Sequence, residues 1–367
     1  MDTQKIKNAI KNLEVSLKKL DNKDLRLYFF VADTKGTPSD SLLYEYQLAV
    51  KLKELGYDVH MLHGEKEFVG VESWLGETYS SLPHHNIEKD NVEIGVADIL
   101  ILPELFSNVM AKTKTLPCKR IVLLQNFDYL LDTIPMGATL EGLGIRDCIT
   151  TSNKFSTRIS TYFKGMKNYV VRPAVPQVFS LIKTKRKLIV NIVSKNQAEA
   201  NNIVKPFQWK FPQLGFVTFR FISNQPVKDM ALYLNEGDIT VWIDDTTDFG
   251  IGALQAMAAG NIVIGKIPEN EPEWMLNDKG ELKNNGLWFY KKDDIPAILA
   301  GVVQGILKNE VPSEIVSEMK STVAEYTDEK QMEDVKATFD GILDLRKKEL
   351  TVLLDAMKNN LNKQEEE

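Results

Sequence analysis

The sequence has 367 residues, which is more than one ordinary hydrophobic core accommodates and indicates two domains. Hydrophobic residues make up 43% and charged residues 26%, a balance that excludes disorder for most of the chain, and the net charge of −6 argues against general nucleic-acid binding. The sequence contains no apolar run long enough for a membrane span, and its first residues lead into a charged helix rather than an apolar signal core, so we expect no secretion.

Cysteine and histidine are scarce in this sequence. Cys118 and Cys148 show no pairing pattern, which favours a reducing compartment and a cytoplasmic protein, in the host cell if the source is a virus. His84 and His85 follow Pro83 in what we interpret as a loop tip. Since the histidines lack metal-ligand spacing, we predict no metal site and no cofactor.

The predicted elements of the first half alternate between helix and strand. A helix over residues 1–20 carries an apolar stripe, and the apolar strand 25–32 follows. After a polar turn, Ser39 or Asp40 is placed to cap a helix over 41–55, and Gly56 ends it before a strand over 57–62. Strand, helix and strand at this spacing predict a parallel sheet, which further apolar runs extend: 97–102, 120–124, 147–152 and 169–173.

The second half repeats this alternation after a basic connector, residues 183–187. Strands are predicted over 188–193, 216–222, 239–243 and 262–264, with a helix of small residues over 252–259. We therefore expect an α/β fold of two Rossmann-like domains facing a cleft, with extra terminal helices. The predicted boundaries are an N-terminal helix (1–22), a first domain (23–180), a second domain (187–312) and C-terminal helices (313–367).

The two chain ends carry apolar stripes on charged helices, and the C-terminal helices end in the acidic run Glu365–Glu367. One interpretation is that the terminal helices pack on the body, the last one crossing back to the first domain. The alternative is that one of them binds a partner protein or a second copy of the chain.

The loop from Asp244 to Gly252 joins a predicted strand to a helix and is the most informative segment. Its glycines permit close backbone approach, and the free amides of a helix start suit a diphosphate. The structural alternative is a tight strand-to-helix turn with no ligand.

This loop and the helix after it, residues 248–265, resemble the signature of retaining glycosyltransferases with the GT-B fold, family four in particular. The match covers Phe249-Gly250, Ala256-Met257-Ala258, Gly260 and Val263-Ile264. Residues 169–179 and 285–289 are similar to two further segments of that family. The resemblance implies two facing Rossmann domains, of which the first binds the acceptor and the second a nucleotide-sugar, without metal.

The resemblance also implies site residues. The two glutamates of the family motif fall on Thr247 and Gln255, so both carboxylates are missing. Thr247 or Asp248 would face the sugar, and Gln255 would contact the ribose. The donor diphosphate would lie against Lys195 and the loop of Phe249, Gly250, Ile251 and Gly252. Lys205 is a second basic residue, but it does not fall on the family's second basic position. The acceptor side would include Gly36, Gln125 and Asn126.

The leading interpretation is a glycosyltransferase that moves a sugar from a nucleotide-sugar to an unknown acceptor with retention. The alternative is a catalytically inactive protein of the same fold, a pseudoenzyme, with a binding or structural role in a larger assembly such as a viral particle. The loss of both motif carboxylates and the extra terminal helices favour this alternative. A sugar-phosphate epimerase of the same fold would need histidine and acidic motifs that this sequence lacks.

Overall fold

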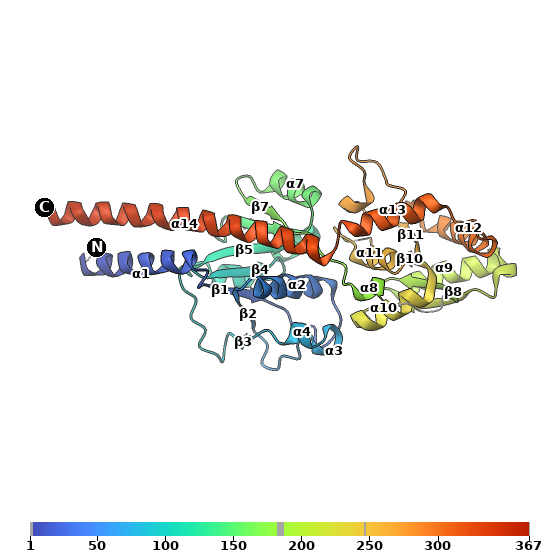
Figure 1. The fold of residues 1–367 in the computed structure, drawn as a ribbon, viewed down its shortest axis with the longest axis horizontal. Helices are drawn as coiled ribbons and strands as arrows, with labels where there is room; N and C mark the ends of the chain where they lie inside the picture. The colour runs from blue at the N-terminus through green and yellow to red at the C-terminus, as the bar shows by residue number, and fades with distance from the viewer. Residues whose placement is uncertain (1–2, 182–186, 246, 367) are drawn as a thin grey trace.

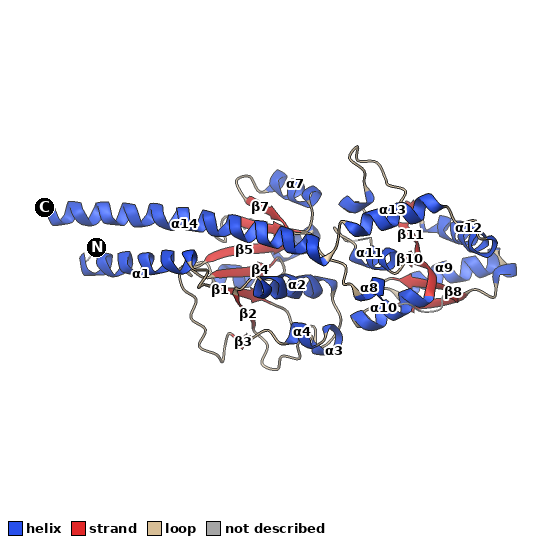
Figure 2. Cartoon of the chain, viewed as in Figure 1, coloured by secondary structure: helices blue, strands red, loops and turns tan. Residues whose placement is uncertain are grey.

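The computed structural model describes residues 3–181, 187–245 and 247–366 (Figure 1). Of the predicted connector, residues 183–186 lie outside the described residues, as do Thr246 in the motif loop and Glu367 in the acidic run. Two lobes, each a sheet covered by helices, lie end to end, and a long helix runs from the second lobe along the first (Figure 2). This arrangement confirms the predicted α/β class with two sheets and extra terminal helices.

The first sheet has seven strands in the described residues, all parallel, in the order β3-β2-β1-β4-β5-β6-β7. Its strands are β1 (Arg26–Phe30), β2 (Asp58–His63), β3 (His84–Asn86), β4 (Ile99–Pro103), β5 (Lys119–Leu124), β6 (Asp147–Thr150) and β7 (Lys167–Val170). The loop-tip interpretation of His84 and His85 is wrong, because both lie in the edge strand β3. A segment of three residues is too short to show the alternation of apolar and polar side chains that predicts a strand. The strand β3 is therefore defined by its pairing with β2.

Most helices of the first half lie on the two faces of this sheet, whereas the first helix projects beyond it (Figure 1). The helices are α1 (Thr3–Asp21), α2 (Asp40–Glu54), α3 (Glu72–Leu75), α4 (Glu77–Ser80), α5 (Ser107–Lys112), α6 (Phe127–Thr133), α7 (Asn153–Tyr162) and α8 (Val178–Leu181), the last lying against the second lobe. Of the two predicted caps of α2, the structure uses Ser39, whose hydroxyl accepts a hydrogen bond from the Leu42 amide. Asp40 therefore lies in the first turn of α2, and its side chain does not cap the helix.

The second sheet has five strands in the described part of the chain, again all parallel, in the order β12-β11-β10-β8-β9. They are β8 (Lys187–Val193), β9 (Thr218–Ile222), β10 (Gly237–Trp242), β11 (Ile262–Lys266) and β12 (Leu287–Phe289). The helices are α9 (Gln197–Lys210), α10 (Val227–Glu236), α11 (Ile251–Ala258), α12 (Ile295–Lys308), α13 (Ser313–Ala324) and α14 (Asp328–Glu366), and short 3₁₀ turns are η1 (Pro212–Leu214), η2 (Glu273–Met275) and η3 (Lys292–Asp294).

Each sheet is packed on both faces, as parallel sheets require. In β1, Leu27 and Phe29 belong to the core under α2, whereas Tyr28 and Phe30 belong to the core on the opposite face. The second sheet likewise has one core under α10, α11 and α13 and another under α9 and α12. The carboxyl ends of both sets of strands therefore meet where the two lobes join.

The last helix, α14, completes the core of the first lobe. Phe339, which is fully buried, and Leu350 pack in the same core as β1 and α2. Ion pairs fix the register of α14: Lys51 with Asp328 at 2.7 Å, Arg172 with Asp334 at 2.8 Å and Lys119 with Glu349 at 2.9 Å. The first lobe thus depends on residues from both ends of the sequence.

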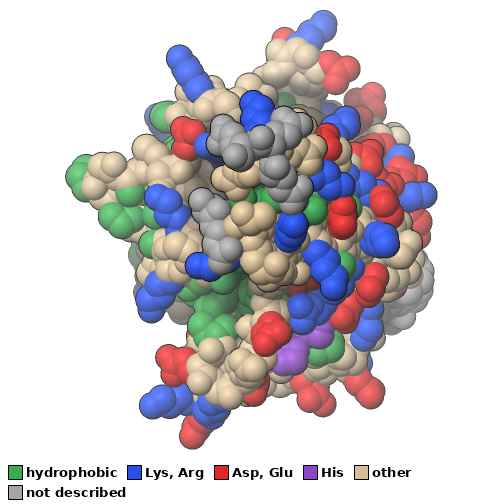
Figure 3. Space-filling model, turned by 90° about the vertical axis from the view of Figure 1, so that its left-hand side faces the viewer, with side chains coloured by type: hydrophobic (Ala, Val, Ile, Leu, Met, Phe, Trp, Pro, Cys, Tyr) green, Lys and Arg blue, Asp and Glu red, His purple; other side chains and the backbone are tan. Residues whose placement is uncertain are grey.

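Beyond the first sheet, α1 and the end of α14 form a projecting pair of helices (Figure 1). Ile6, Leu13 and Leu20 are spaced by seven residues and buried, and Lys358 pairs with Glu14 at 2.7 Å. Seen from this end, basic and acidic side chains are interspersed (Figure 3). No helix within the described residues has the length and apolarity to cross a bilayer.

The role of α14 in the first lobe can be measured. Phe339→Ala removes a fully buried ring, so we expect the free energy of unfolding to fall by about 3–5 kcal/mol in urea denaturation. Val352→Ala, on the same helix but 70% exposed, should change it by less than about 0.5 kcal/mol. Equal effects of the two substitutions would contradict a stabilising role of the Phe339 ring in the core of the first lobe.

Candidate functional site

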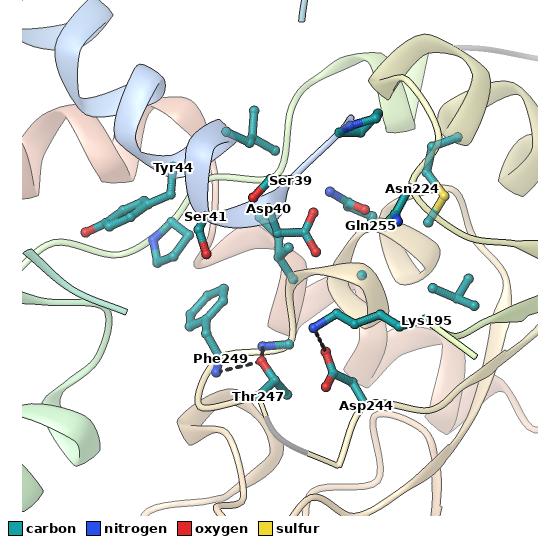
Figure 4. Close-up of a pocket in the computed structure, with 18 of the residues that line it drawn as sticks. Ser39, Asp40, Ser41, Tyr44, Lys195, Asn224, Asp244, Thr247, Phe249 and Gln255 are labelled. Atoms are coloured by element: carbon teal, nitrogen blue, oxygen red, sulfur yellow. Dashed lines mark hydrogen bonds and ion pairs between the residues drawn. The ribbon is translucent and has the colours of Figure 1, made fainter. Parts of the chain in front are cut away.

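A cavity of about 310 Å³ lies between the two lobes, at the carboxyl ends of both sheets (Figure 4). The first lobe contributes the start of α2 and the loop after β5, and the second lobe contributes the loops after β8, β9 and β10. Such a position is where doubly wound sheets bind ligands, because the loops that follow parallel strands all open to the same edge.

The loop between β10 and α11 forms one wall of this cavity. The Thr247 hydroxyl accepts hydrogen bonds from the amides of Phe249 at 3.2 Å and Gly250 at 2.8 Å, which folds the loop into a turn (Figure 4). Gly250 has a φ of +72°, and a Cβ built there would lie 2.7 Å from the Trp242 ring. A glycine is required at this position for both reasons.

A cluster of three tryptophans, Trp242, Trp274 and Trp288, lies behind the loop. The Trp274 ring lies against both Trp242 and Trp288, and its indole Nε1 donates to the Phe249 carbonyl at 2.5 Å. Trp274 is 1% exposed, so the loop rests on a rigid, buried aromatic group. The backbone of residues 249–252 is thereby held at a fixed place in the cleft.

The first turn of α11 faces the cavity with Ile251 and Gly252 in its lining. Amides of a helix's first turn have no acceptor within the helix and carry partial positive charge, so they suit an anionic group. Gln255, one turn later, also lines the cavity; its side chain is 4% exposed and has no hydrogen bond with the described residues. Its amide is therefore available to a ligand.

Lys195 follows β8 and points into the cavity (Figure 4). Its Nζ lies 3.5 Å from the Asp244 carboxylate, and its side chain is 66% exposed. Burial between the walls lowers the pKa of Lys195, but Asp244, Tyr129 and Asp40 raise it more, so the amine is charged. An anionic ligand would meet this cation together with the first turn of α11.

Asp248 does not line the cavity. Its carboxylate accepts hydrogen bonds from the Phe127 amide at 2.7 Å and from Arg158 at 3.0 Å, both in the first lobe. Burial raises the pKa of Asp248, and the Phe127 amide and Arg158 offset part of that rise. The structure thus places Asp248 in a contact between the lobes, outside the lining of the cavity.

Two further carboxylates of the second lobe bind the first lobe. Glu273 accepts hydrogen bonds from Asn153 at 3.2 Å and from the Lys154 amide at 2.8 Å, at the start of α7. Glu271 pairs with the Lys154 ammonium at 2.9 Å. This acidic loop therefore holds the amino end of α7, where the helix dipole favours negative charge.

Gln125 and Asn126, after β5, rest on a buried pair of carboxyl groups. Glu104 Oε1 accepts from the amides of Gln125 at 3.2 Å and Asn126 at 2.9 Å, and Glu45 Oε1 accepts from the Gln125 side chain at 3.2 Å. Burial raises the pKa of Glu45 well above its usual range and that of Glu104 to about 7. The Asn126 side chain caps α6 by accepting from the amides of Asp128 and Tyr129.

The structure brings most of the predicted site residues to the cleft, but not all. Gln125, Asn126, Lys195, Thr247, Gln255 and residues 249–252 line the cavity. Gly36 lies in the turn before α2, outside the lining, and Lys205 is exposed on α9, also outside it. Sequence reasoning missed Asp40 and Asn224, which both line the cavity (Figure 4). The signal for Asp40 was its position directly after the cap of α2.

The raised pKa of Glu104 predicts how stability depends on pH. The folded state binds this proton more tightly than the unfolded chain, so its stabilising contribution is complete below about pH 4.5 and is lost as the pH rises through about 7. We expect the free energy of unfolding to fall by about 3 kcal/mol from pH 4.5 to pH 8 for this reason. Urea denaturation of Glu104→Gln across that range should show a smaller fall; an identical pH profile would contradict the assignment.

No group of three or more His, Cys, Asp or Glu side chains in the described residues is arranged to hold a metal ion. No protein-family model matches the sequence, and no curated protein matches it either.

Solved structures do match the fold. The pneumococcal O-GlcNAc transferase GtfA, in complex with UDP and GlcNAc, is 9% identical, with a TM-score of 0.59 over 87% of this chain and 99% of that one. Sucrose-phosphate synthase from Thermosynechococcus elongatus is 11% identical, with a TM-score of 0.59 over 88% and 100%. HepE from Anabaena, in complex with UDP-glucose, is 12% identical, with a TM-score of 0.59 over 86% and 100%. The chain therefore has the two-domain GT-B fold of glycosyltransferases, as its sequence motif predicted.

Proposed function

We propose that this protein is a glycosyltransferase that transfers a sugar from a nucleotide-sugar, of the UDP-sugar class, to an acceptor. The observation that carries this proposal is the cavity between the lobes, where the first turn of α11, Lys195 and the unpartnered Gln255 amide face the same space. Similar structures bind UDP or UDP-glucose, which supports the choice of nucleotide.

In this proposal the donor diphosphate lies against the first turn of α11 and Lys195, and Gln255 contacts the ribose. As the bond between the sugar C1 and the diphosphate oxygen breaks, its electron pair stays on the diphosphate, whose charge Lys195 and the amides stabilise. The acceptor hydroxyl forms the new bond to C1 on the same face, and its proton passes to the departing phosphate. The configuration at C1 is retained, and no metal is needed to bind the leaving group.

The donor site can be tested by calorimetric titration of the protein with UDP, with and without Mg²⁺. We expect micromolar binding that does not depend on Mg²⁺. Lys195→Ala should weaken it at least tenfold, because a charged hydrogen bond contributes about 1.5–3 kcal/mol. Lys205→Ala removes an equal charge outside the cavity and is the matched control, which should leave binding unchanged. Equal losses in both variants would contradict a specific diphosphate contact by Lys195.

A second candidate function is a catalytically inactive GT-B protein that binds partners in a larger assembly. Asp248, Glu271 and Glu273, three acidic residues in and after the motif segment, are engaged in contacts between the lobes. The projecting α1–α14 pair exposes Val15, Val352 and Leu353, which a partner protein or a second copy of the chain would cover. Absence of binding by UDP and by other nucleotides to the folded protein would favour this candidate.

A further inference from the structure

Two sets of polar side chains that line the cleft differ in whether the protein supplies their hydrogen-bond partners. In the first set, the Thr247 hydroxyl accepts hydrogen bonds from the loop amides, and the Gln125 side chain donates one to Glu45. The side chains of Asp40, Asn224 and Gln255 line the same cavity and make no hydrogen bond or ion pair with the described residues. Gln255 is buried, whereas Asp40 and Asn224 are exposed to the cleft, so a ligand in the cavity can reach all three side chains without breaking a contact within the protein.

Asp40 is the one member of this second set that carries a charge. It occupies the first turn of α2, directly after the cap Ser39, and its carboxylate points into the cleft toward the second lobe (Figure 4). The side chain is accessible to solvent from the cleft. The surrounding walls nevertheless remove part of its hydration, which raises the pKa of the carboxyl; Lys195 lowers it and Asp244 raises it again.

Asp40 and Lys195 therefore face each other from opposite lobes. Lys195 belongs to the second lobe, on which the nucleotide and its diphosphate are proposed to lie. In that arrangement a first-lobe side chain opposite the cation would lie beside the donor, within reach of its sugar. A carboxylate is a strong acceptor for sugar hydroxyls, because each oxygen takes charge-assisted hydrogen bonds.

The charges of the cleft also restrict which sugar fits. Among the described residues that line the cavity, Asp40 and Asp244 are acidic and Lys195 is the basic one. A donor diphosphate would occupy Lys195, and Asp244 already pairs with that lysine, so the Asp40 carboxylate has no cation of its own in the cavity. A sugar that carries its own carboxylate would be repelled by Asp40, whereas a neutral sugar with free hydroxyls would be bound.

We propose that Asp40 is the carboxylate that binds the donor sugar in this protein, in place of the two motif carboxylates replaced by Thr247 and Gln255, and that it selects neutral over acidic sugars. This inference rests on the glycosyltransferase function proposed above. Asp40 acts as a specificity-determining residue from the first lobe, so the sugar would be recognised only when the two lobes face each other as they do here.

The test compares three ligands, UDP, UDP-glucose and UDP-glucuronic acid, by calorimetric titration of the full chain. For wild-type protein we expect UDP-glucose to bind more tightly than UDP, and UDP-glucuronic acid more weakly than UDP-glucose. Asp40→Asn keeps the shape but removes the charge. This substitution should leave the affinity for UDP unchanged within about twofold. It should reduce the ratio of the UDP-glucose affinity to the UDP affinity roughly tenfold, and it should bring the affinities for UDP-glucose and UDP-glucuronic acid closer together.

Asp229→Asn is the matched control, since Asp229 is also an acidic first-turn residue, on α10, and lies outside the cavity lining. It should leave all three affinities as in the wild type. If wild-type protein binds UDP but Asp40→Asn keeps the full advantage of UDP-glucose, the role of Asp40 is overturned while the donor site stands. If wild-type protein binds neither UDP nor UDP-glucose, the proposed function fails and the role of Asp40 with it.

Discussion

The contact that Asp248 makes across the lobes is the interaction on which the form of the cleft depends. Its carboxylate belongs to the loop that precedes α11, yet its partners are the start of α6 and a side chain of α7. The loop is therefore held from both domains at once. Because Asp248 is 8% exposed, removing one partner would leave a buried charge, so the two lobes are strongly coupled at this point. Thr247 and Phe249, the sequence neighbours of Asp248, line the cavity beside this contact.

The cleft has few cations for a site proposed to bind a diphosphate. Lys195 is engaged by Asp244, so much of the attraction must come from backbone amides at the start of α11. Such amides are fixed dipoles that need no rearrangement when an anion binds. The tryptophans under the loop are consistent with this, since Trp274 fixes the Phe249 carbonyl and with it the direction of the neighbouring amides.

The first lobe is assembled from the two ends of the chain. Phe339 of α14 fills the same core as the strands near the N-terminus, and Glu349 pairs with Lys119 on β5. Such contacts join residues hundreds of positions apart in the sequence. The core of the first lobe therefore needs a helix that follows the whole second lobe in the chain. The helix that links them also carries Asp334, which binds Arg172 just after the first sheet. The position of the second lobe is thus tied to the core of the first.

The sequence by itself determined the alternation of elements, the parallel sheets and the motif loop, because these depend on local periodicity and on glycines whose conformations few other residues can adopt. Its resemblance to a known family also pointed to Gln255, through the spacing of the motif, and to Lys195, through its position directly after the first strand of the second domain. The tertiary structure alone decided which carboxylates face the cavity. Either Thr247 or Asp248 was expected to face the sugar; Asp248 binds Phe127 and Arg158, whereas Asp40 enters the cleft from the other lobe. Partners so far apart in sequence leave no local pattern, since their meeting depends on how the two domains pack.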